Sequence, residues 1–171
     1  MWNKLQDRFR NSPSQLMVIN KLIQSGLSVV RDFENVPRIY CSDVEIKPNS
    51  LANAMGIDRR VVLEALRKIS EDPDLYTFFS NLKPMANLGG ADYLANFGRI
   101  QIIPEEANRP GIIAGILSVI AAHGINVRQV IVDDPEMVKD PKALVITEKT
   151  IPAELLPELR KVAGVRAIVI L

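Results

Sequence analysis

Residues 98 to 130, GRIQIIPEEANRPGIIAGILSVIAAHGINVRQV, decide the fold of the second half of the chain. An apolar strand around residues 100 to 103 runs into a polar loop that ends in Asn108-Arg109-Pro110-Gly111. We expect an apolar helix to begin there, since proline presets the backbone for a helical start, and to stop at Gly124. A second strand follows from Ile125.

The rest of this half continues the alternation of strands and helices. Residues 142 to 148, KALVITE, and the apolar residues 165 to 171 are predicted strands, with a helix over residues 153 to 162 between them. The order strand, helix, strand, strand, helix, strand is typical of the ferredoxin-like βαββαβ fold. The last strand is almost continuously apolar, so we expect it to be central or to lie at an interface.

The first half contains several helix signals. Ser12 and Pro13 begin a helix that Gly26 closes, and LANAMGIDRRVV, residues 51 to 62, predicts two short helices with Gly56 in the turn. This layout resembles a helix-turn-helix. Residues 27 to 41 are mixed and receive no assignment. The overall class is therefore α+β, with a helical, winged helix-turn-helix-like domain over residues 1–88 and a ferredoxin-like domain over residues 98–171.

The boundary between the two domains follows from glycine content. Asn87-Leu88-Gly89-Gly90 is the predicted hinge, because paired glycines interrupt regular structure, and residues 89–97 form the expected linker. A short helix around residues 91 to 96 is expected within that linker.

Composition narrows the functional classes. No apolar run is long enough to cross a membrane, and the polar N-terminus does not read as a secretory signal, so a cytoplasmic location is the default expectation. The single Cys41 excludes an intramolecular disulfide and a cysteine-rich zinc site. The lone His123 has no nucleophile paired with it, and we expect no metal, no cofactor and no enzymatic activity. Residues 1 to 85 carry 12 Lys and Arg against 10 Asp and Glu, a weak basic excess for a nucleic-acid-binding domain.

The loop and helix over residues 105 to 124 resemble those of the ACT domain, a module that usually binds amino acids. Within that family the pattern is most similar to the regulatory domain of phosphoglycerate dehydrogenases, where an NRPG loop and the asparagine of a GxN segment bind serine at a dimer interface. The resemblance implies effector binding by Asn108, Gly111 and Asn126, and homodimers or larger homo-oligomers formed through this domain. Where that family has a histidine, this chain has Glu106, a carboxylate that would repel the ligand carboxylate but meet its ammonium.

The residues of the loop also support an effector site by their chemistry. Pro110 and Gly111 place exposed helix amides where a carboxylate is favoured, and Asn108 and Asn126 each offer a donor and an acceptor. We expect Asn126, at the start of the second strand, to lie close to this loop in the ferredoxin-like topology. Arg109 lies within the same loop, although a solvated side chain is its ordinary role. The alternative interpretation is structural: Asn108 caps the helix and Asn126 begins a strand.

Two functions remain open for the whole chain, which resembles archaeal regulators of amino-acid metabolism that join these two domains. The first is an amino-acid-responsive regulator of transcription, with DNA as partner of the first half and Arg59, Arg60 and Lys68 as contact residues on the second helix of the motif. The second is a regulatory subunit that does not bind DNA and docks on a metabolic enzyme. Neutralisation of those cations by neighbouring acids would favour docking.

Overall fold

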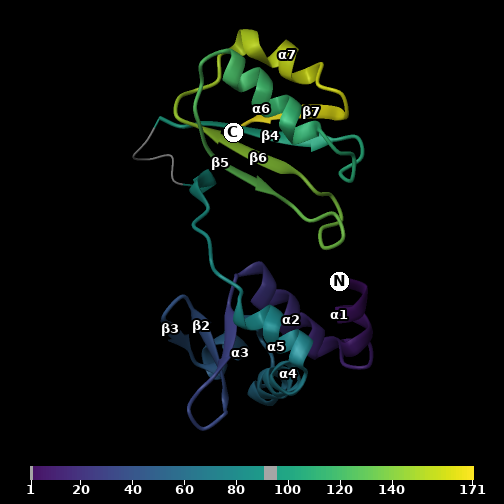
Figure 1. The fold of residues 1–171 in the computed structure, drawn as a ribbon, viewed down its shortest axis with the longest axis vertical. Coiled ribbons are helices and arrows are strands. Elements are labelled where there is room, and N and C mark those ends of the chain that lie inside the picture. The colour runs from purple at the N-terminus through teal and green to yellow at the C-terminus, as the bar shows by residue number, and fades with distance from the viewer. Residues whose placement is uncertain (1, 91–95) are drawn as a thin grey trace. The chain divides into compact units, whose positions relative to one another are not determined.

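The computed structural model describes residues 2–90 and 96–171, and the chain divides into two compact units (Figure 1). The first unit is Met1–Ala86 and the second is Asn87–Leu171. Most of the predicted linker, and the short helix expected within it, falls on residues 91–95 and so lies outside the described residues. Within the described ranges, no helix has the length and apolar character needed to cross a membrane.

The first unit combines helices with a small sheet. Two helices open it, a three-stranded antiparallel sheet follows, and three helices close it. In chain order these elements are α1 (Trp2–Phe9), α2 (Pro13–Gln24), β1 (Ser28–Arg31), β2 (Pro37–Cys41), β3 (Val44–Ile46), α3 (Pro48–Met55), α4 (Arg59–Glu71) and α5 (Pro73–Ser80).

The prediction of a helical first half missed this sheet. Strands β1, β2 and β3 pair in sequence order, with Val29 opposite Ile39 and Ile39 opposite Ile46. Asn35 and Ser42 adopt the left-handed conformation in the two connections, which makes both turns tight. The sheet precedes α3 and α4, so it is not a wing that follows the second helix of the motif.

The predicted helix pair is present in this unit. Helices α3 and α4 are joined by Gly56, Ile57 and Asp58, and Gly56 has φ +64°. Asp58 caps α4, since its Oδ1 accepts a hydrogen bond of 2.7 Å from the Arg60 amide. The buried stripe of α4 packs on α2, α3 and β1 in the core of the unit. Its members are Val62, Ala65, Leu66 and Ile69.

The second unit confirms the predicted order of elements. It contains η1 (Leu88–Gly90), β4 (Gly98–Pro104), α6 (Ile112–Ala122), β5 (Val127–Val132), β6 (Ala143–Thr147), η2 (Ala153–Leu155), α7 (Leu156–Arg160) and β7 (Val165–Ile170). The strands form one antiparallel sheet in the order β5-β6-β4-β7, which is the ferredoxin-like arrangement. Of the two places expected for the last strand, the central one is wrong, because β7 is at an edge and Ile170 is 52% exposed; its place at an interface stays a prediction.

Helices α6 and α7 cover the same face of this sheet (Figure 1). Ile112, Ile116 and Ile120 project from α6 at helical spacing onto the apolar residues of β4 and β6. The opposite face receives η1, since the Leu88 amide donates to Gln129 Oε1 at 2.9 Å and Arg99 Nη1 donates to the Gly89 carbonyl at 2.7 Å. Residues 88–90 therefore belong structurally to the second unit.

Candidate functional site

The loop between β4 and α6 holds five of the six residues predicted to bind an effector. All five are exposed: Glu106, Asn108, Arg109, Pro110 and Gly111. The Arg109 amide donates to the Glu106 carbonyl at 3.1 Å, which closes a turn. Helix α6 begins at Ile112, two residues later than Pro110, and the residue at its N-cap is Gly111 with φ +90°. Asn108 is therefore not the cap of this helix, so the structural alternative proposed for it is wrong.

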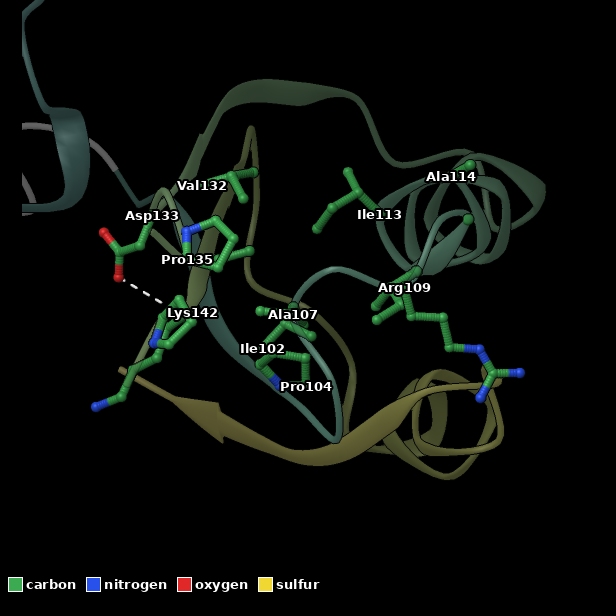
Figure 2. Close-up of a pocket in the computed structure, with 14 residues that line it drawn as sticks. Ile102, Pro104, Ala107, Arg109, Ile113, Ala114, Val132, Asp133, Pro135 and Lys142 are labelled. Atoms are coloured by element: carbon green, nitrogen blue, oxygen red, sulfur yellow. Dashed lines mark hydrogen bonds between the residues drawn. The ribbon is translucent and has the colours of Figure 1, made fainter. Parts of the chain in front are cut away.

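A pocket of about 180 Å³ opens beside this loop (Figure 2). One wall is the loop with the first turn of α6, and the other is the connection between β5 and β6. Fourteen residues line it: Ile102, Pro104, Ala107, Arg109, Gly111, Ile112, Ile113, Ala114, Val132, Asp133, Pro135, Pro141, Lys142 and Ala143. A pocket of this size suits a small metabolite and is below the ~300 Å³ at which drug-sized sites begin.

Charged side chains lie at the margin of the pocket. In Figure 2 the Arg109 guanidinium and the Lys142 ammonium point away from the interior, on opposite sides. Asp133 is fixed beside Lys142, because its Oδ2 accepts a hydrogen bond of 3.1 Å from the Lys142 amide and its own amide donates to the Lys142 carbonyl at 2.9 Å. These two hydrogen bonds, one to the Asp133 side chain and one between backbone groups, close the β5–β6 connection at its base.

The structure brings only part of the predicted effector set together. Arg109 and Gly111 line the pocket, whereas Glu106, Asn108 and Pro110 lie in the same loop outside it. The sequence prediction missed the β5–β6 connection as a component of the site. The topology explains why this connection lies beside the β4–α6 loop. Strands β4 and β5 are both antiparallel to β6, so their carboxyl ends lie at the same end of the sheet.

Asn126 lies elsewhere, and the expectation that it approaches the Asn108 loop within one chain is wrong. It precedes β5, and Val127 pairs with Thr147, which pairs with Gly98 at the start of β4. The loop follows the other end of β4, six residues along the strand, or about 20 Å at 3.3 Å per residue. Because β4 and β5 run parallel, the end of one and the start of the other cannot share an edge.

Asn126 instead forms a structural link with Glu148. Its Nδ2 donates to Glu148 Oε2 at 2.9 Å, and the Glu148 amide donates to the Asn126 carbonyl at 2.9 Å. The side-chain hydrogen bond from Asn126, aided by one from its backbone amide, holds the pKa of Glu148 below its ordinary value. These contacts agree with the structural role predicted for Asn126 at the start of a strand.

The predicted DNA-contact residues are divided between two sides of α4. Arg59 and Arg60 are exposed in its first turn. Lys68 lies half-buried, with Nζ 3.3 Å from Ser12 Oγ and 5.4 Å from the centre of the Phe9 ring. Lys68 follows Arg59 by nine residues, or two and a half turns at 3.6 residues per turn, so these two side chains leave α4 on opposite sides. The prediction that Lys68 faces outward with the two arginines is therefore wrong.

Acidic neighbours accompany the exposed cations of α4. Arg60 forms an ion pair with Asp58 at 3.4 Å, and Arg67 forms a bidentate contact with Glu71 at 3.0 and 3.1 Å. Leu63 lies on the same side and is 40% exposed. Ion pairs at such exposed positions contribute at most about 1 kcal/mol and exchange readily for other anions.

Comparison with known proteins gives limited information. No protein-family model matches the sequence, and no curated protein matches it. The ACT domain from GTP pyrophosphokinase of Chlorobium tepidum is 24% identical with a TM-score of 0.34, over 44% of this chain and 96% of that chain. The P2 domain of a chemotaxis kinase from Thermotoga maritima is 15% identical with a TM-score of 0.35, over 44% and 95%.

A further solved structure is the regulatory subunit of aspartate kinase from Thermus thermophilus, 22% identical with a TM-score of 0.34. The aligned region covers 44% of this chain and half of the length of that subunit. The ferredoxin-like assignment of the second unit rests on its own strand order.

Proposed function

We propose that the chain is a regulatory protein that responds to an amino-acid effector bound by its second unit. The observation that carries this proposal is the small pocket formed where Arg109 and Gly111, two residues expected to bind an effector, meet the β5–β6 connection. The first-turn amides of α6 border the pocket and lack intrahelical acceptors, so that wall favours a carboxylate.

The effector acts by shifting an equilibrium between arrangements of the protein. It does so only to the extent that its affinity differs between them. A homodimer that forms through the second unit would be one of these arrangements. The unpaired edge of β7, with exposed Val169 and Ile170, supports pairing of two copies, since open apolar strand edges associate readily. Sedimentation of the full chain at micromolar concentration should give a dimer, and a monomer would contradict this part of the proposal.

The first unit is the output module, and the proposed output is regulation of transcription. The pair α3–α4 has a three-residue turn, and Arg59 and Arg60 stand exposed in the first turn of α4, where a recognition helix makes its contacts. Docking on a metabolic enzyme is the second candidate. It is favoured by the pairing of Arg60 with Asp58 and of Arg67 with Glu71, and by the exposed Leu63 between them.

Effector binding is tested by a thermal-shift screen of the full chain against the amino acids. A ligand that binds only the folded state raises stability by RT ln(1 + [L]/Kd), about 2.7 kcal/mol at one hundred times Kd. Selective stabilisation by one or a few amino acids is the expected result. Equal melting temperatures with every amino acid at millimolar concentration would contradict the proposal.

The output is tested by recovery of genomic fragments, followed by salt titration of two matched variants. Arg59→Ala and Lys68→Ala each remove one positive charge from α4, but only Arg59 is on the exposed first turn. If α4 contacts phosphates, Arg59→Ala should reduce the salt slope by about 0.9 and Lys68→Ala should leave it unchanged. If the wild-type protein recovers no specific fragment, with or without amino acids, docking on an enzyme becomes the better proposal.

A further inference from the structure

The interior of the pocket is apolar. Only three of its fourteen lining residues carry a charge, and in Figure 2 the head groups of Arg109 and Lys142 point out of it. Ile113 extends from α6 across the hollow toward Val132 and Pro135. A hydroxyl or amide group placed between these side chains would lose its water without gaining a partner, which is unfavourable.

The polar groups lie around the margin of the pocket, with Arg109 and Lys142 on opposite sides of it. The first turn of α6 and the cations Arg109 and Lys142 lie at the rim, while Ile102 and Pro104 lie within the hollow. A second hollow of about 160 Å³ adjoins the first, and both are lined by Pro104, Ala107, Pro141 and Lys142. Its charged lining residues are Glu105, Lys139, Asp140, Lys142 and Arg166.

The charge around the two hollows favours an anion weakly. Four cations, Arg109, Lys139, Lys142 and Arg166, stand against three acids, Glu105, Asp133 and Asp140. One of these acids, Asp133, lines the apolar pocket itself on the side of Lys142, and its Oδ2 accepts a hydrogen bond from the Lys142 amide.

We infer that the ligand of this pocket is a small carboxylate with an aliphatic chain, of the size of leucine, isoleucine or valine. The inference rests on the proposed function and specifies its effector. The aliphatic chain of the ligand occupies the space between Ile113, Val132 and Pro135, and its carboxylate remains at the rim beside the first turn of α6. Serine does not fit, because its hydroxyl would lie among apolar side chains. An amino acid and its 2-oxo acid share the required chemistry.

The test is calorimetric titration of the full chain with leucine, with the 2-oxo acid of leucine, with alanine and with serine. Leucine or its 2-oxo acid should bind at least roughly 10-fold more tightly than alanine, since one methylene in an apolar pocket already contributes about 10-fold or more. The comparison of leucine with its 2-oxo acid shows whether the ammonium adds affinity.

Two variants, each with leucine in place of an alanine, locate the site. Ala107→Leu adds a branched side chain at a position that lines both hollows, whereas Ala122→Leu makes the same change at the exposed far end of α6. We expect Ala107→Leu to weaken leucine binding by roughly 10-fold or more, as overfilling a packed apolar site does, and Ala122→Leu to leave it unchanged.

The outcomes separate this inference from the proposed function. Binding of serine or another polar amino acid, with no binding of aliphatic ones, would overturn the inference while effector binding stands. Equal leucine affinity in wild type, Ala107→Leu and Ala122→Leu would place the site elsewhere and overturn the inference, while the proposed effector binding stands. Absence of binding for every amino acid and 2-oxo acid would overturn both.

Discussion

Replacing Gly98 by alanine tests how the second unit is held together at the start of β4. A Cβ atom at this position would overlap with the Lys149 carbonyl oxygen and with Thr147 Oγ1, and would lie 3.0 Å from the Ile151 amide nitrogen. Two of these three atoms belong to the backbone, so no side-chain rotation relieves the overlap. Thr147 is fully buried, and its hydroxyl donates to the Lys149 carbonyl at 2.7 Å.

The expected cost has two components. Forcing apart a packed core costs about 1–3 kcal/mol. Breaking the Thr147–Lys149 hydrogen bond leaves a buried hydroxyl unsatisfied, which costs about 1–3 kcal/mol more. The second unit should therefore lose roughly 2–6 kcal/mol of its free energy of unfolding, a large share of the 5–15 kcal/mol typical of a domain.

Hydrogen exchange followed by mass spectrometry measures this loss segment by segment. Peptides of residues 98–171 should exchange faster in Gly98→Ala, while those of residues 2–86 keep their protection, because each unit has its own hydrophobic core. Gly90→Ala is the matched control in the same unit, since a Cβ at Gly90 meets nothing within 4 Å. Equal protection in Gly98→Ala and Gly90→Ala would refute the reasoning.

Two further predictions concern single polar side chains. A hydrogen bond from the Val36 amide, and further bonds from Arg38 and the Glu34 amide, lower the pKa of Asp32 in the folded protein. The stability that Asp32 contributes is therefore present above its unfolded pKa of about 3.9 and is lost as pH falls through the folded pKa. Asp32→Asn should therefore be less stable than wild type at neutral pH and should lack this loss in acid urea titrations; an unchanged acid profile would exclude the explanation. Asn126→Ala should raise the pKa of Glu148 toward its ordinary value in an NMR titration and leave effector affinity unaltered; a large loss of affinity would instead place the site at an interface between two copies.

The elements that could be predicted from the sequence are those set by residues close together along the chain. The turn at Gly56 identified the helix pair α3–α4, and the alternation of strands and helices after Gly98 identified the βαββαβ order. These features are local, because a turn or an apolar stripe involves residues within a few positions of one another. For the same reason the polar loop between β4 and α6 was recognised before its surroundings were known.

Features that depend on distant partners were missed. The sheet of β1, β2 and β3 consists of strands of three to five residues whose register is set by cross-strand pairs such as Val29 and Ile39. Lys68 was predicted to face outward with Arg59 and Arg60, but its Nζ lies 5.4 Å from the centre of the Phe9 ring of another helix. Asn126 was misplaced because its proximity to the loop was assumed without following the direction of β5.

An aliphatic effector bound between the β4–α6 loop and the β5–β6 connection should protect both segments together. Hydrogen exchange of the full chain with and without saturating leucine tests this expectation directly. The predicted result is slower exchange in residues 104–114 and 132–143 together, with unchanged exchange in peptides around Asn126 and Glu148. Slower exchange confined to any other part of the chain, or no change at a leucine concentration far above the measured Kd, would contradict it.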